Sequence, residues 1–106
     1  MSDEYQIPVP PSFQALYVDR RQRLTVPVAE LRERSEFCED LALQLMERAQ
    51  ALQFDLGLSE DLVLERMHAG LCEADGIVSL PEAGWVIRRL AELLDWPPLE
   101  LPPPAG

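Results

Sequence analysis

Side chains of metal-ligating type recur at helical spacing in the second half of the chain. They are Asp61, Glu65, His68 and Cys72. Steps of four, three and four residues place them on one face of an α-helix. Carboxylate, imidazole and thiolate groups bind zinc and iron, and Glu-x-x-His pairs occur in di-iron bundles. Such a bundle needs a second Glu-x-x-His, and the chain has one histidine. We favour a solvated acidic helix face over a metal site.

The stretch LCEADGIVSLPE, residues 71–82, resembles a calcium-binding EF-hand loop. The polar ligand positions of that register hold Glu73, Asp75, Ser79 and Glu82. Its first position holds Leu71, which supplies no carboxylate. The same residues are typical of an Asp-Gly turn followed by a helical capping box. We therefore expect a helix start here, and we expect no metal or other cofactor.

Nucleophilic and phosphate chemistry find little support in the residue types. A cysteine nucleophile needs a base such as histidine beside it, and the chain has no second histidine. Cys38 falls in an apolar stripe, where a free thiol acts as a small core residue. All nine basic residues are arginine. The absence of lysine removes a Schiff-base nucleophile and the Gly-Lys-Ser/Thr of a phosphate-binding loop. The expectation is a protein that is not an enzyme.

An aromatic residue on a polar helix face indicates an interface instead. Trp85 is predicted to lie beside Arg88 and Arg89, away from the apolar stripe of its helix. Tryptophan and arginine together are common where proteins meet. Either another part of the chain covers the indole, or the three residues form a docking patch for a protein partner. Phe13 and Tyr17 of the N-terminal segment are further candidates for contact with that partner.

Three amphipathic helices are predicted to position these side chains. They run from Pro27 to about Phe54, from Ser59 to near Cys72, and from Ser79 to about Leu94. Their apolar faces are Leu31, Cys38, Leu41, Ala42, Leu45, Ala49 and Leu52; Val63, Leu64, Met67 and Leu71; and Ala83, Val86, Ile87, Leu90, Leu93 and Leu94. Short connections favour an all-α three-helix bundle.

The predicted domain boundaries follow the prolines. Residues 1–26 are expected to form an extended proline-rich arm that ends in an arginine-rich loop, with a short helical turn after Pro11. Residues 27–96 form the three-helix domain, and residues 97–106 are expected to be a disordered proline-rich tail. Apolar residues in the arm indicate that it is ordered rather than a flexible leader.

The formal net charge of −10 repels phosphate backbones, so nucleic-acid binding is not expected. A helix-turn-helix that presents Arg88 and Arg89 is the alternative, but its connection is longer than the usual turn.

No apolar run is long enough to cross a membrane, and the acidic start lacks a signal-peptide pattern, so we expect a cytoplasmic protein. An acidic face on the first helix could meet a basic partner: Glu33, Glu36, Asp40 and Glu47.

At PPSFQALY, FCEDLA, LERMHAGL and EAGWVIRRLAELLDW the chain resembles a small uncharacterised proteobacterial family. That family carries the automatic label "ATPase with chaperone activity". The resemblance implies an all-helical bacterial protein of the cytoplasm, associated with a chaperone or an ATPase. The residues do not support an ATPase by itself, because the chain has no lysine and no glycine-rich phosphate loop.

The sequence therefore predicts an acidic helical protein-interaction module, an adaptor or regulator that is a monomer or a weak homodimer. The rival interpretation is a small metal- or ligand-binding protein that uses the 71–82 loop or the His68 column.

Overall fold

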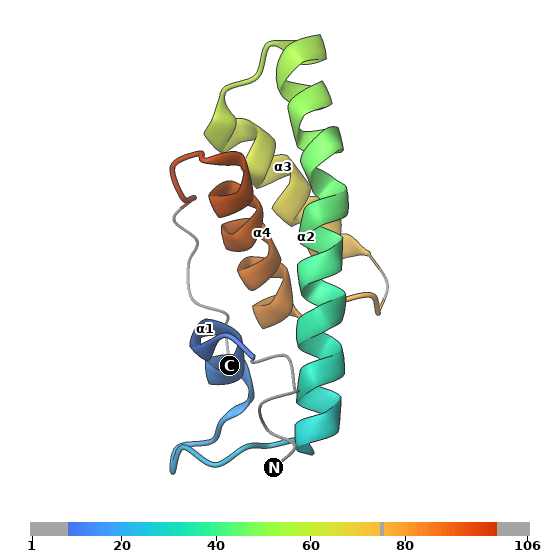
Figure 1. Ribbon diagram of the computed structural model, residues 1–106. Helices are drawn as coiled ribbons and strands as arrows, with labels where there is room; N and C mark the ends of the chain where they lie inside the picture. Colours follow the sequence, from blue (N-terminus) through green and yellow to red (C-terminus); the bar gives the residue numbers. More distant parts are fainter. Residues whose placement is uncertain (1–8, 75, 100–106) are drawn as a thin grey trace. The chain divides into compact units, whose positions relative to one another are not determined.

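The computed structural model describes residues 9–74 and 76–99, and these residues form an all-α protein (Figure 1). The helices are α1 (Pro11–Gln14), the 3-10 helix η2 (Ala15–Tyr17), α2 (Val28–Leu56), α3 (Glu60–Glu73) and α4 (Leu80–Leu94). The described part of the chain contains no strand, only an isolated antiparallel bridge between Val18 and Leu24. The predicted all-α class is confirmed. Residues 1–8, Asp75 and most of the predicted tail, residues 100–106, lie outside the described residues.

The chain divides into two units, residues 1–37 and 38–106. In the first unit, the prediction of an extended arm is wrong for α1 and η2. Pro10 caps this turn, because its carbonyl accepts the backbone N–H groups of Phe13 and Gln14 at 2.9 and 3.0 Å. Pro11 fits the first helical position, where no N–H is needed. The short helical turn expected after Pro11 is therefore present, and Phe13 on it is fully buried.

The arginine-rich loop that follows is shaped by Asp19. Its carboxylate accepts the backbone N–H groups of Arg21 and Arg23 at 2.8 and 3.0 Å. Gln22 takes a left-handed conformation with φ of 64°, which the tight turn requires. The loop is thus a defined turn.

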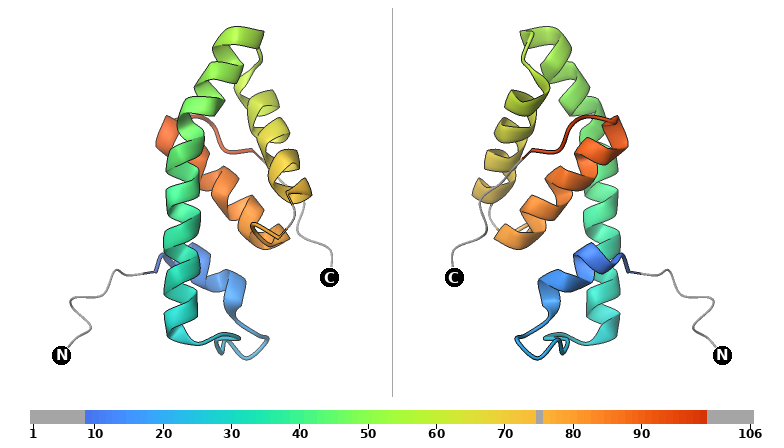
Figure 2. Two further views of the ribbon diagram at one scale, coloured as in Figure 1. Left: turned by 90° about the vertical axis from the view of Figure 1, so that its right-hand side faces the viewer. Right: turned by 90° about the vertical axis from the view of Figure 1, so that its left-hand side faces the viewer.

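In the second unit, α3 and α4 pack against each other (Figure 2). The apolar side chains larger than alanine that they bury completely are Val63, Leu64, Val86, Ile87 and Leu90. All five were predicted to face the core, and this prediction is confirmed. From α2 the same unit buries only small side chains fully, Cys38, Ala42 and Ala49. The predicted core leucines of α2 in this unit, Leu41, Leu45 and Leu52, are half-buried.

Local signals explain where the helices of this unit end. α2 continues two residues past Phe54 to Leu56, and Gly57 with φ of 64° then turns the chain. Ser59 and Ser79 are the N-caps of α3 and α4. At the end of α4, Asp95 adopts a left-handed conformation, and the N–H of Trp96 bonds to the carbonyl of Ala91 at 2.9 Å. No described helix has both the length and the apolar content that crossing a membrane requires.

The capping box of α4 supports a direct test of helix stability. Ser79 Oγ accepts the N–H of Glu82 at 3.2 Å, and Glu82 Oε1 accepts the N–H of Ser79 at 2.9 Å. We expect Ser79→Ala to lower the free energy of unfolding by about 1 kcal/mol, measured by urea denaturation.

The matched control is Ser59→Ala, because Ser59 Oγ accepts no backbone N–H of α3 and donates only to the exposed carboxylate of Asp61. It should cost less than Ser79→Ala. Equal losses for the two variants would contradict the importance of the capping box.

Candidate functional site

The predicted patch around Trp85 is not an exposed aromatic surface. The Trp85 residue is 6% exposed, so its indole is withdrawn from water. Arg88 is exposed, and Arg89 is half-buried. Of the N-terminal candidates, Phe13 is buried and its ring centroid lies 5.7 Å from that of the half-buried Tyr17. Arg88 is thus the one predicted partner-binding residue with a freely accessible side chain.

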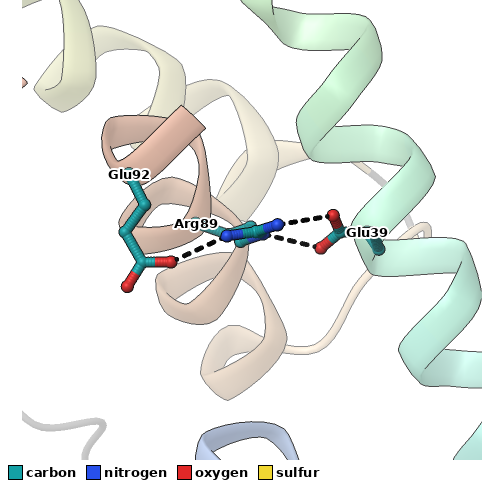
Figure 3. A network of polar contacts seen from close by, with 3 residues as sticks. All are labelled: Glu39, Arg89 and Glu92. Atoms are coloured by element: carbon teal, nitrogen blue, oxygen red, sulfur yellow. Dashed lines mark hydrogen bonds and ion pairs between the residues drawn. The ribbon is translucent and has the colours of Figure 1, made fainter. Parts of the chain in front are cut away.

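Arg89 is held by two carboxylates (Figure 3). Its Nε donates to Glu39 Oε1 at 2.8 Å and its Nη2 donates to Glu39 Oε2 at 3.0 Å, which is a bidentate pair between α4 and α2. Its Nη1 donates to Glu92 Oε1 at 3.1 Å. The hydrogen bond to Glu39, helped by Glu92 and opposed by desolvation, raises the pKa of Arg89 above its usual value. A guanidinium that already binds two carboxylates links the helices, and it is less available to bind a partner protein.

The His68 column shows one contact between candidate ligands. The Sγ atom of Cys72 lies 3.6 Å from Nε2 of His68. Asp61 is turned toward the start of α3, where Ser59 Oγ donates to Asp61 Oδ1 at 2.6 Å. Glu65 is exposed. Within residues 9–74 and 76–99, no group of three or more metal-ligating side chains is placed to hold an ion.

The predicted calcium-loop residues serve other roles. Leu71 is buried among the apolar residues of α3, and Glu82 is 2% exposed and closes the capping box with Ser79. Glu73 is exposed on the last turn of α3. Asp75 lies outside the described residues. The alternative interpretation as a turn and helix start accounts for the geometry around Ser79.

Large apolar side chains are exposed where α2 turns into α3. The exposed fractions are 88% for Phe54, 55% for Leu56 and 44% for Leu62. From the sequence, Phe54 is predicted only to lie near the end of a helix. One signal was available: Phe54 is eleven residues after Leu43, which puts it on the polar side of α2, opposite the apolar stripe. Leu43 on that side is 46% exposed.

A hollow of about 340 Å³ lies between α2 and α3. Its lining residues are Leu45, Arg48, Leu52, Arg66, Met67, Gly70 and Leu71. We call this the α2–α3 groove. The leucines and the methionine of the groove were predicted to be core residues, and no role was predicted for Arg48 or Arg66. Nothing in single-helix periodicity predicts which leucines stay half-covered, because that depends on the packing of two helices.

Comparison of the chain with family models, with curated proteins and with solved structures finds no match. The resemblance noted from the sequence stays a prediction.

The link between α2 and α4 can be measured by a double-mutant cycle with Glu39→Ala and Arg89→Ala. We expect a coupling free energy of about 0.5–1 kcal/mol, because the pair is bidentate but both side chains are about one-third exposed, at 33% and 34%. Chemical denaturation of the four proteins gives the value. The control cycle uses Glu92→Ala, whose side chain is 68% exposed, and should give about 0.3 kcal/mol. A Glu39 coupling below the Glu92 coupling would contradict the assignment.

Asp61 provides a test by pH. The hydrogen bond from Ser59 lowers the pKa of Asp61, and backbone N–H groups of Asp61 and Leu62 lower it further, while desolvation opposes them. A carboxylate with a lowered pKa stabilises the fold above its unfolded pKa, and this contribution is lost as the pH falls through the folded pKa. We expect Ser59→Ala to move the Asp61 pKa upward in a carboxyl NMR titration. An unchanged Asp61 pKa in this variant would show that the hydrogen bond from Ser59 is not the main cause of the lowered pKa.

Proposed function

We propose that this protein is a non-enzymatic interaction module, an adaptor or regulator that binds another protein through the α2–α3 hairpin. The single observation that carries the proposal is the exposure of Phe54, at 88%, near the end of α2, where Leu56 and, on the first turn of α3, Leu62 are also exposed. Single exposed apolar residues are common on protein surfaces, but a group of large ones at one turn is typical of a contact site. The proposal includes a three-helix bundle over residues 27–96.

The energetics support a contact at this turn. Burying a phenylalanine side chain is favourable by roughly 1.5–3 kcal/mol, and Phe54 realises little of this within its own chain. A partner that covers Phe54 and Leu56 would gain that free energy. The net charge of −10 opposes nonspecific association of the exposed turn, so the contact is selective for a complementary surface.

The resemblance to the chaperone-labelled family suggests the class of partner. We propose a chaperone or an ATPase of the bacterial cytoplasm, with this chain as an associated protein rather than as the ATPase. Within the same proposal, Trp85, Arg88 and Arg89 act as a second docking patch only if the indole becomes accessible on binding.

A second candidate function is metal binding, favoured by the 3.6 Å contact between Cys72 Sγ and His68 Nε2. This pair would need further ligands from Asp61, Glu65 or a partner. Zinc titration followed by NMR amide shifts over residues 61–82 tests it, and unmoved amides would remove the candidate. In the alternative function, a DNA-binding helix-turn-helix, Arg88 would be the one arginine on α4 that is not already held by an ion pair.

The interaction is tested with Phe54→Ser. The substitution removes exposed apolar surface, so we expect the free energy of unfolding to change by no more than about 0.5 kcal/mol. In affinity capture from the native cell, we expect at least a tenfold loss of the partner that the unaltered protein recovers, measured by quantitative mass spectrometry.

The matched control is Leu80→Ser, which changes a 55%-exposed apolar residue at the start of α4. It should recover the partner normally. The proposal fails if the unaltered protein captures nothing specific, or if Phe54→Ser captures the same proteins in the same amounts.

A further inference from the structure

The α2–α3 groove combines an apolar floor with a cationic rim. The residues that form its floor are Leu45, Leu52, Met67, Leu71 and Gly70. The remaining two are Arg48 from α2 and Arg66 from α3, and no acidic residue lines the groove. This composition contrasts with the chain as a whole, which has nineteen acidic residues and nine basic ones.

Both rim arginines are available for a partner. Arg48 and Arg66 are exposed, and within the described part of the chain neither guanidinium has a hydrogen bond or an ion pair. Arg89 shows the contrast, because it is already held by Glu39 and Glu92. A carboxylate brought to the groove therefore gains a charge-assisted hydrogen bond without displacing one.

The floor of the groove is accessible as well. Leu45 and Leu52 are half-buried, so part of their apolar surface faces water. At Gly70, a Cβ atom built on the backbone meets nothing within 4 Å. A missing side chain at this position leaves room for an apolar side chain from a partner. A hollow lined by apolar side chains of two helices is the kind of surface that receives an amphipathic helix.

We propose that the α2–α3 groove binds an acidic amphipathic helix of a partner protein, with apolar side chains seated over Leu45, Leu52 and Gly70 and carboxylates paired with Arg48 and Arg66. This inference rests on the proposed function and specifies the chemistry of the partner. Charge complementarity selects the occupant: two unpaired cations border an apolar floor that has no lining carboxylate.

The test uses two fluorescent peptides of about 16 residues that share the same leucine stripe. One carries glutamates beside the stripe and the other carries lysines. Fluorescence anisotropy with the full chain should show that the glutamate peptide binds at least tenfold more tightly than the lysine peptide. The affinity of the glutamate peptide should fall as the salt concentration rises, because partly exposed ion pairs are screened.

Substitutions then locate the site. Arg48→Glu combined with Arg66→Glu should weaken binding of the glutamate peptide at least tenfold and strengthen binding of the lysine peptide. Arg20→Glu combined with Arg21→Glu is the matched control, since it reverses two exposed charges outside the groove, and it should change the affinity less than twofold. Gly70→Leu fills the hollow from α3 without adding charge, and it should weaken both peptides. Circular dichroism confirms that each variant keeps its helix content.

The result that would overturn the inference is binding that ignores the groove. If the unaltered protein bound the lysine peptide more tightly, the partner helix would be basic rather than acidic. The proposed interaction function would still stand. Equal effects of the groove double substitution and of Arg20→Glu combined with Arg21→Glu would show that only net charge matters. Tighter binding of dodecanoate than of the glutamate peptide, or a dimer that buries the groove in sedimentation experiments, would assign another occupant. The Phe54→Ser capture experiment tests the interaction function separately from all of these results.

Discussion

Five large apolar side chains of α3 and α4 are withdrawn completely from water, and the rest of the C-terminal unit depends on this packing. They are Val63, Leu64, Val86, Ile87 and Leu90. Each buried aliphatic side chain stabilises the fold by roughly 1.5–3 kcal/mol, so this pair of helices contains most of the large apolar burial in the unit. The capping box at Ser79 fixes where α4 begins and therefore which of its residues face α3.

α2 relates to this pair differently, and the difference produces the candidate interaction surface. Its fully buried residues in the unit are small, Cys38, Ala42 and Ala49, while Leu45 and Leu52 are only half-buried. The bidentate pair of Glu39 with Arg89 adds a polar link from α2 to α4. Because the chain's own packing leaves part of the apolar surface of α2 uncovered, a groove remains between α2 and α3. Arg48 and Arg66 on its rim give that groove a charge opposite to that of the whole chain.

Periodicity and capping residues were sufficient to predict the three long helices and the buried faces of α3 and α4. The same reasoning placed Trp85 on a polar face, yet Trp85 is buried, since a helical wheel shows one helix and not what packs around it. Arg89 was predicted to bind a partner, but its carboxylate partner Glu39 is fifty residues away in the chain, where sequence spacing carries no signal. The arm was predicted to be extended apart from a short helical turn after Pro11, and that turn is present as α1.

The central claim is that the leucines of α2 present apolar surface to water in the folded protein. Solvent paramagnetic relaxation of methyl groups, using a soluble gadolinium chelate, measures this directly. The account predicts strong relaxation of the Leu45 and Leu52 methyls, alongside weak relaxation of those of Leu64 and Leu90, whose residues are fully buried. Equal protection of all four leucines would show that the groove is closed in solution and would contradict the account.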